Sequence, residues 1–160
     1  MDKFAHAGIG SGNGRYALLA LRLAVGWLYF YAGLSKLLEP GWTAAGYLKG
    51  ASGPFAQFFL SMSGSVMVDF LVKWGLLLIG LAIIIGAVTR FAAFWGVVIT
   101  LLFYFSKFPP QHGLVDEHII YIAAFAVLTA TGIGRLVGID GTAFMSRLVE
   151  KMRWLKWLVA

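Results

Sequence analysis

The sequence predicts an all-α membrane protein, a bundle of four transmembrane helices. Of its 160 residues, 60% are hydrophobic and only 12% are charged, and the mean hydropathy is +0.83. Soluble domains carry about 25% charged residues, and small domains bury only about two-thirds of their surface. These values exclude a soluble globular domain and a disordered chain. A closed barrel is the other structure that spans membranes, but the apolar runs are too long and show no period-two alternation.

Four apolar stretches reach or approach the roughly 20 residues that a helix needs to cross a bilayer. They run from about residue 16 to 38, 66 to 88, 91 to 108 and 118 to 139. The third stops at Pro109 and Pro110, because proline cannot continue a helix. The predicted membrane domain therefore covers residues 16–140, after a glycine-rich flexible tail at 1–15 and before a C-terminal segment at 141–160.

Two further segments are expected to lie on the membrane. Residues 40–65 form a long, aromatic-rich connection, which predicts a short helix or re-entrant cap on the outer side. Residues 141–160 predict a basic amphipathic helix at the anionic cytoplasmic surface. Its apolar stripe spans an arc of about 80° at 100° per residue and consists of Phe144, Leu148, Met152, Leu155 and Val159, flanked by Lys151 and Lys156.

The basic residues near the span ends predict the orientation of the chain. With four crossings, both termini and the turn after the second helix share a side. That side holds eight basic residues (Lys3, Arg15, Arg90, Arg135, Arg147, Lys151, Arg153 and Lys156), and the opposite side holds four (Lys36, Lys49, Lys73 and Lys107). Basic residues concentrate on the cytoplasmic side, so we expect a multi-pass protein of the cell membrane with both termini in the cytoplasm. The net charge of +6 then reports orientation and does not indicate nucleic-acid binding.

The first helix carries a polar face. Ionisable residues cost on the order of 2.5–3.5 kcal/mol at the centre of a membrane helix, so they are expected to point into the bundle. At 100° per residue, five residues lie within about 80° of one another: Arg22, Gly26, Tyr29, Gly33 and Lys36. The glycines on this face allow another helix to approach closely.

The second and fourth helices carry matching polar residues. Asp69 and Lys73 are four residues apart, in the acid-then-base order that favours a helical ion pair. On the fourth helix, Tyr121 lies one turn after Glu117, with His118 beside that line. The first, second and fourth helices are therefore each expected to direct polar groups into the bundle interior.

The predicted topology brings these groups to one end. The third helix adds Lys107 at its outer end, where the charged groups of the other helices also lie. We therefore predict one polar cavity open to the outer surface and floored by Tyr29 and Tyr121. Arg22 lies nearer the inner half, so we expect it to have an acceptor other than Glu117.

Each of these residues also has a purely structural interpretation. Lys36 and Lys107 lie near span ends, where long side chains reach back to the headgroups. Asp69 and Lys73 could form a pair that only stabilises the bundle. Glu117 stands at a helix start, where the helix dipole favours an acid.

A metal or haem site is not expected. The chain has no cysteine, which excludes disulfides, thiolate metal sites and iron–sulfur clusters. Only His112 and His118 share a side, too few ligands for zinc or haem. The stretch GIGRLVG at residues 132–138 does not follow a strand, so it predicts close helix packing and a helix stop rather than a phosphate loop.

Three stretches resemble the DoxX/DoxD family of membrane proteins. LRLAVGWLYFYAGLSKL, with Arg22, Gly26, Gly33 and Lys36, is similar to the family's opening helix. GLLLIGLAIIIGAVTRFAA is similar to its second and third helices, and DEHIIYIAAFAVLTATGIGRLVGID, which ends at Asp140, to its last helix. The resemblance covers roughly residues 16 to 141 and rests on small residues and isolated charges in apolar helices.

This resemblance implies a four-helix membrane protein, and in one branch the large subunit of a thiosulfate:quinone oxidoreductase. Other members have no established chemistry, and some resemble assembly factors or subunits of redox complexes, so membership does not settle activity. The redox hypothesis assigns substrate binding to Arg22, Tyr29, Lys36, Asp69, Lys73 and Lys107, and catalysis to Glu117, His118 and Tyr121. A quinone is then the expected substrate or bound ligand, and membrane lipid and a partner subunit or second copy are the expected partners.

Two other classes of function remain open. A non-catalytic scaffold or assembly factor would use the buried charges to fix helix register. A small transporter is disfavoured, because four helices show no pair of broken helices.

Overall fold

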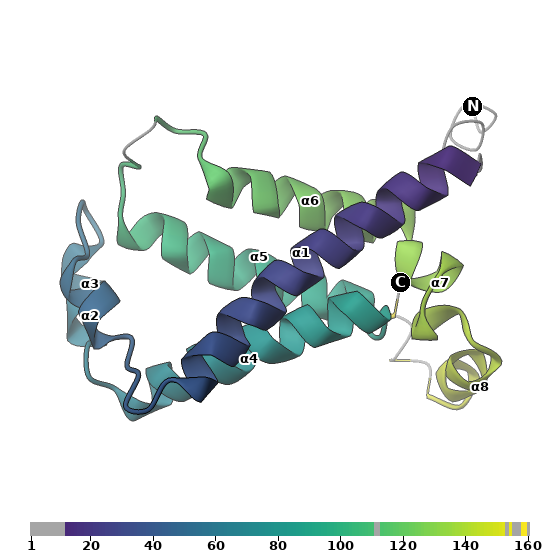
Figure 1. Ribbon diagram of the computed structural model, residues 1–160, viewed down its shortest axis with the longest axis horizontal. Helices are drawn as coiled ribbons and strands as arrows, with labels where there is room; N and C mark the ends of the chain where they lie inside the picture. The colour runs from purple at the N-terminus through teal and green to yellow at the C-terminus, as the bar shows by residue number, and fades with distance from the viewer. Residues whose placement is uncertain (1–11, 111–112, 153, 155–157, 160) are drawn as a thin grey trace.

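The computed structural model describes residues 12–110, 113–152, 154, 158 and 159, and it confirms the all-α prediction. Four helices form the bundle: α1 (Gly12–Leu38), α4 (Val66–Ile85), α5 (Thr89–Ser106) and α6 (Glu117–Thr131). Figure 1 shows two short helices, α2 (Ala45–Lys49) and α3 (Ala56–Ser61), at one end, here named the cap end. The opposite end carries the start of α1, the α4–α5 turn, α7 (Ile133–Leu136), the 3-10 turn Ile139–Gly141 and α8 (Ala143–Lys151), and is named the α8 end.

Three of the four bundle helices are long and apolar enough to cross a membrane. These are α1, α4 and α5, with 27, 20 and 18 residues. The fourth, α6, is apolar but has only 15 residues. At 1.5 Å per residue α6 is about 22 Å long, shorter than a hydrocarbon core of about 30 Å.

The predicted fourth span, residues 118–139, is therefore too long. α6 ends because Gly132 adopts a left-handed conformation with φ of +58°, which favours glycine and stops a helix. The next residues form the separate helix α7, which confirms the predicted helix stop. At the other terminus α1 begins at Gly12, so the predicted flexible tail of 1–15 extends too far; residues 1–11 lie outside the described part.

α1 and α4 pack with their backbones in close contact. A Cβ atom at Gly33 would lie 2.3 Å from the backbone N of Leu77, and one at Gly80 would lie 2.1 Å from the backbone N of Phe30. Neither position has room for a side chain. The predicted close approach through small residues is confirmed.

The cap that sequence analysis predicted consists of the two short helices. Ala44, Leu48 and Phe59 form a small apolar core of their own, apart from the main core of the bundle. The cap is joined to the end of α5, because the backbone N–H of Ser52 donates to the carbonyl of Ser106 at 3.0 Å. The chain after α1 thus folds back over the bundle end.

The C-terminal helix is shorter than predicted. α8 ends at Lys151, so the predicted apolar stripe does not extend along one helix to Val159. Val159 lies beyond the helix and is only 1% exposed. Leu155 and Lys156 lie outside the described residues. The chain instead returns to the bundle, where the carbonyl of Leu158 accepts from the backbone N–H of Phe91 at 3.2 Å. The membrane-surface position of α8 stays a prediction.

The α1–α4 contact yields a stability prediction. The substitution Gly33→Val should lower the free energy of unfolding by about 1–3 kcal/mol or more, because the new side chain overlaps the backbone of α4. The measurement is the thermal midpoint in detergent. Gly46→Val on α2 is the matched control, since nothing lies within 4 Å of a Cβ there; equal losses in the two variants would contradict the packing argument.

The orientation across the membrane yields a second prediction. The natural chain has no cysteine, so a thiol reagent can label only the single cysteine that is introduced. Gly46→Cys at the cap end should react with an impermeant thiol reagent added to intact cells, and the exposed Ser146→Cys on α8 should react only after lysis. Labelling of Ser146→Cys in intact cells would place the cap end in the cytoplasm.

Candidate functional site

The cap end gathers most of the ionisable side chains that the sequence singled out. α1 and α5 end there and α4 and α6 begin there. This places Lys36, Asp69, Lys73, Lys107, Glu117 and His118 at one end, as predicted. Their contacts divide them into two groups, one around Trp42 and one around Tyr47.

In the first group, two lysines from different helices share one aromatic ring. The Nζ atoms of Lys36 and Lys73 lie 5.5 Å and 5.3 Å from the centroid of the Trp42 ring. All three residues are half-buried. Lys36 also donates to the carbonyl of Ala32 at 2.9 Å, whereas Lys73 has no hydrogen-bond or ion-pair partner within the described part of the chain. Cation–π contacts stabilise each ammonium, and the two like charges together favour an anion nearby.

The predicted ion pair between Asp69 and Lys73 is not formed. The Asp69 carboxylate instead accepts the backbone N–H of Ala44 at 2.7 Å. Ala44 immediately precedes α2, so the bond ties the first turn of α4 to the cap. A carboxylate satisfied by this backbone group leaves the ammonium of Lys73 free to lie over Trp42.

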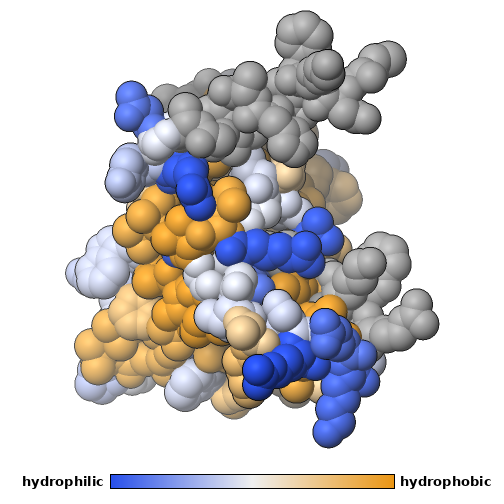
Figure 2. All heavy atoms as spheres, turned by 90° about the vertical axis from the view of Figure 1, so that its right-hand side faces the viewer, coloured by the Kyte–Doolittle hydropathy of each residue, from blue (hydrophilic) through white to orange (hydrophobic). Residues whose placement is uncertain are grey.

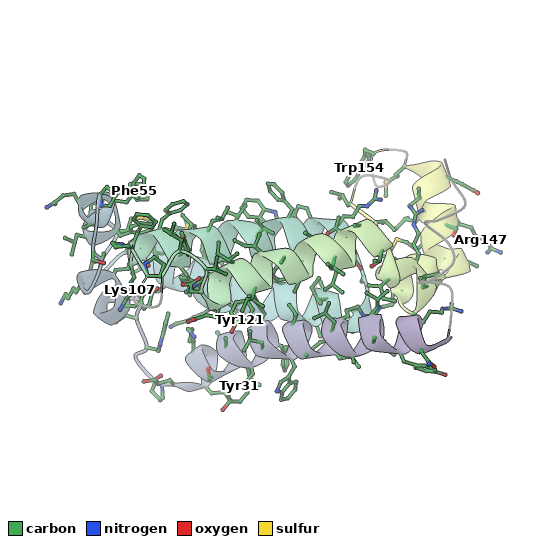
Figure 3. All side chains as sticks on the ribbon, turned by 90° about the horizontal axis from the view of Figure 1, so that it is seen from above. Tyr31, Phe55, Lys107, Tyr121, Arg147 and Trp154 are labelled. Carbon is green, nitrogen blue, oxygen red and sulfur yellow. The ribbon has the colours of Figure 1, made fainter. Side chains whose placement is uncertain are left out.

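The second group surrounds Tyr47 on α2. The Nζ atom of Lys107 lies 4.8 Å from the centroid of the Tyr47 ring, and Figure 3 shows Lys107 at the cap end. The Tyr47 hydroxyl donates to the carbonyl of Phe103 at 3.3 Å and accepts from the Ser106 hydroxyl at 3.0 Å. Burial raises the pKa of Tyr47, and the nearby carboxylates of Glu117 and Asp116 raise it further. The hydrogen bond from Ser106 acts in the opposite direction and lowers this pKa.

The start of α6 is organised by Asp116, which sequence analysis did not single out as a site residue. Its carboxylate accepts the backbone N–H of His118 at 3.0 Å, as an N-cap does, and also lies 2.9 Å from Nδ1 of His118. Desolvation raises the pKa of Asp116, but the hydrogen bonds from the His118 ring and from the backbone lower it by more. The pKa of Asp116 therefore lies below its usual value. The Tyr104 ring packs edge-on against His118, with centroids 6.2 Å apart.

Glu117 and His118 lie together at this helix start but differ in surroundings. Glu117 is exposed, while His118 is half-buried. One potential ligand atom from each of Asp116, Glu117 and His118 lies within 4.8 Å of the others. Exposed acidic groups are common in proteins without a metal, and Asp116 already accepts the backbone N–H groups of His118 and Ile119 here.

Tyr29 and Tyr121 meet in the bundle, as predicted. Their rings are edge-on with centroids 6.4 Å apart, and Figure 3 shows Tyr121 between α6 and α1. Tyr29 is buried, and its hydroxyl forms a short hydrogen bond with Thr100, which in turn donates to the carbonyl of Gly96 at 2.6 Å. The hydroxyl of Tyr121 has no hydrogen-bond partner among the described residues. Thr100 was missed because a lone threonine in an apolar helix gives no sequence signal.

Arg22 lies apart from both groups. It is 3% exposed, and Nη1 donates to the carbonyl of Ile133 at 3.2 Å, while Nη2 lies 3.5 Å from the carbonyl of Ile84. The expectation of an acceptor other than Glu117 is confirmed. Because these carbonyls lie at the α8 end, Arg22 does not share a pocket with the lysines of the cap end.

Asp140 provides the missing cap of α5. Its carboxylate accepts the backbone N–H groups of Val88 at 2.6 Å and Thr89 at 2.9 Å, and it is 3% exposed. Val88 has a φ of +45°, which is strained for a β-branched residue. No side chain near Val88 in sequence caps this helix, so the requirement was invisible in the sequence.

These features accompany a clear family match. The model of the DoxX family matches residues 17–109. The chain belongs to the DoxX family. The match covers all but the first turn of α1 and everything up to the end of α5, and it stops before α6, which carries Glu117, His118 and Tyr121. No curated protein and no solved structure gives a significant match.

The contact made by Asp140 in this DoxX protein yields a prediction. Asp140→Ala should lower the free energy of unfolding by at least about 2 kcal/mol, because it removes an N-cap and leaves buried backbone N–H groups without a partner. The measurement is the thermal midpoint in detergent. Glu150→Ala, an exposed acid on α8, is the matched control and should change the midpoint little; a comparable loss there would contradict the capping role.

Proposed function

We propose that this DoxX protein takes part in quinone-linked oxidation of a small sulfur-containing anion of the thiosulfate class, either as the enzyme or as its membrane subunit. The observation that carries the proposal is the pair of ammonium groups over Trp42, from Lys36 and Lys73. Two cations held at the end of a membrane bundle attract a dianion from the aqueous phase. Lys107 lies over Tyr47 at the same end, close to the carboxylates of Asp116 and Glu117, so the proposed anion site rests on the two lysines at Trp42.

The quinone side of the reaction needs proton donors near the bilayer. In the thiosulfate case two thiosulfate dianions form one tetrathionate dianion by making an S–S bond, and two electrons are released. A quinone that accepts these electrons also takes up two protons and becomes a quinol. His118 and Tyr121 are the proposed proton donors, and the unpartnered hydroxyl of Tyr121 is available to hydrogen-bond a quinone oxygen.

We propose that electrons pass directly from the sulfur anion to the quinone or through a partner. The chain has no cysteine and therefore no thiolate or iron–sulfur site of its own to store them. Tyr29 supports the site indirectly, since its ring contacts Tyr121 and its hydroxyl is held by Thr100. Glu117 is exposed at the same helix start, where it could exchange protons with water.

The second candidate is a non-catalytic scaffold or assembly factor. The observation that favours it is that several predicted site residues are already engaged within the chain. Asp69 holds the backbone of Ala44, Lys36 holds a carbonyl of its own helix, and Arg22 holds two backbone carbonyls. Charges used in this way fix the positions of helices and need no substrate.

A double-mutant cycle on the two lysines tests the proposal. Lys36→Met and Lys73→Met should each lower kcat/KM for thiosulfate, with a soluble quinone analogue as acceptor, by about tenfold, equivalent to about 1.4 kcal/mol. Because the two ammonium groups share one ring, the double variant should lose less than the product of the single effects. Lys49→Met, an exposed lysine on α2 at the same end, is the control and should retain activity.

The scaffold hypothesis predicts a different result. It expects Lys36→Met and Lys73→Met to lower the thermal midpoint in detergent, and it expects no thiosulfate-dependent quinone reduction in the natural chain. Stable co-purification of another membrane protein, with no such activity in that complex, would support the scaffold and reject the redox proposal.

A further inference from the structure

Residues 41–44, here named the strap, connect α1 to α2 and contact two charged residues of α4. The backbone N–H of Ala44 donates to the Asp69 carboxylate at 2.7 Å. Two residues earlier, the centroid of the Trp42 ring lies 5.3 Å from Nζ of Lys73. Figure 1 shows the chain between α1 and α2 passing beside the start of α4. One short segment therefore engages both charged groups in the first turns of this helix.

The strap is attached to α4 by few interactions. Apart from the bond to Asp69, its hydrogen bonds in the described chain join residues at most four positions apart. Trp42 and Ala44 also pack in the small core of the cap. At the start of the strap Gly41 has a φ of +74°, and nothing lies within 4 Å of a Cβ there. A glycine in open space can change its backbone angles without a clash, so the strap can leave α4 by losing one charged hydrogen bond and part of this packing.

Asp69 and Lys73 have an alternative partner in each other. Their spacing of four residues, with the acid first, favours an ion pair on a helix. The pair is not formed in the structure, where both groups are engaged by the strap. When the strap leaves α4, both groups lose these contacts, and the ion pair replaces them. The two positions of the strap therefore differ by an exchange of partners, which keeps the difference in free energy between them small.

The two arrangements differ in the charge that they offer to an anion. With the strap in place, Lys73 has no ion-pair partner in the described chain, and it shares the Trp42 ring with Lys36. Glu39 partly compensates the charge of Lys36, so Lys73 is the less compensated of the two cations. With the strap displaced, Asp69 neutralises Lys73. An anion therefore binds more tightly to the arrangement with the strap in place, and its binding shifts the equilibrium toward that arrangement.

We propose that the strap is a clamp that closes when an anion binds at Lys36 and Lys73, with Asp69 as its latch. The closed clamp is the arrangement in the structure, and in the open clamp Asp69 pairs with Lys73. Asp69 is thus a positioning residue, because it acts through Ala44 and does not touch the anion. The inference rests on the anion site of the proposed function, but it requires no electron transfer.

The reactivity of a cysteine at position 44 measures the opening of the clamp. Ala44 is 5% exposed and the natural chain has no cysteine, so Ala44→Cys reacts with a soluble maleimide only while the strap is open. Phe59→Cys is the matched control, because Phe59 is 4% exposed in the same small core but lies on α3, outside the strap. The labelling rate of the full chain in detergent is compared in chloride and in sulfate at equal ionic strength. Sulfate serves as a dianion that does not reduce quinones.

The clamp predicts opposite effects of the anion and of the latch substitution. Sulfate should slow the labelling of Ala44→Cys about fivefold or more, because an anion that favours the closed clamp lowers the open fraction in proportion. Adding Asp69→Ala to this variant should speed labelling about tenfold, since a hydrogen bond to a charged group is lost. Adding Glu150→Ala, a remote exposed acid, should leave the rate unchanged. Labelling of Phe59→Cys should respond to neither sulfate nor Asp69→Ala.

Charge variants of Ala44→Cys show where the anion acts. Lys73→Met should abolish the slowing by sulfate, whereas Lys49→Met, an exposed lysine on α2, should keep it. Anions are also attracted to the opposite end of the bundle, since Figure 2 views the α8 end and shows hydrophilic side chains across it. Arg147→Gln removes one exposed charge of that end and should also keep the slowing.

Thiosulfate reacts with thiol reagents, so its effect is measured by deuterium exchange of the Ala44 amide N–H in the natural chain. Because this N–H is bonded to Asp69 only in the closed clamp, thiosulfate and sulfate should each slow its exchange about fivefold or more. The same measurement replaces labelling if Ala44→Cys does not fold.

The clamp is rejected if neither dianion slows the opening, if Asp69→Ala leaves the rate at position 44 unchanged, or if Phe59→Cys responds as strongly as Ala44→Cys. The last result would mean that the whole cap opens. Slowing by both dianions without thiosulfate-dependent quinone reduction would support the clamp and reject the redox proposal. Quinone reduction with an opening rate that no dianion changes would support the redox proposal and reject the clamp.

Discussion

The close contact between α1 and α4 is the constraint on which the cap end depends. With no side chain at Gly33 or Gly80, the two backbones touch, and dispersion contacts replace the hydrophobic effect as the force between helices in lipid. Lys36 lies about one turn beyond Gly33, and Lys73 about one turn before Leu77, the residue that Gly33 contacts. The same contact that packs the helices therefore places both ammonium groups beside Trp42.

The α8 end depends on a different requirement, the satisfaction of backbone groups in a medium without water. α5 begins after a strained Val88 and has no capping side chain of its own. Asp140, about fifty residues later, supplies the carboxylate, and the guanidinium of Arg22 binds the carbonyls of Ile133 and Ile84. Glycines allow this arrangement: a Cβ at Gly134 would lie 2.2 Å from the Thr89 hydroxyl. α6 is short because the chain turns at Gly132, and this turn brings Asp140 to the start of α5.

The two ends of the bundle thus differ in chemistry. The cap end carries lysines over aromatic rings, a capped histidine and a tyrosine whose hydroxyl has no hydrogen-bond partner among the described residues. The proposed anion binding and proton delivery rest on these groups. The α8 end carries the excess of exposed basic residues. Membership in the DoxX family is consistent with either a catalytic or an assembly role, and the lysine pair is the feature that separates the two experimentally.

The sequence by itself determined the helical class, the first three spans, the glycine contact, the family and the gathering of charges at one end, because hydrophobic length and helical period are local properties. The sequence did not predict those contacts of polar side chains whose partners lie far away in the chain. Asp69 and Lys73 have the right spacing for an ion pair, yet Asp69 binds Ala44 and Lys73 lies over Trp42, because the cap folds back onto α4. Only the tertiary structure placed Arg22 with Ile133, Asp140 with Val88 and Tyr29 with Thr100, since which buried polar groups meet is decided by helix packing and not by their order in the chain.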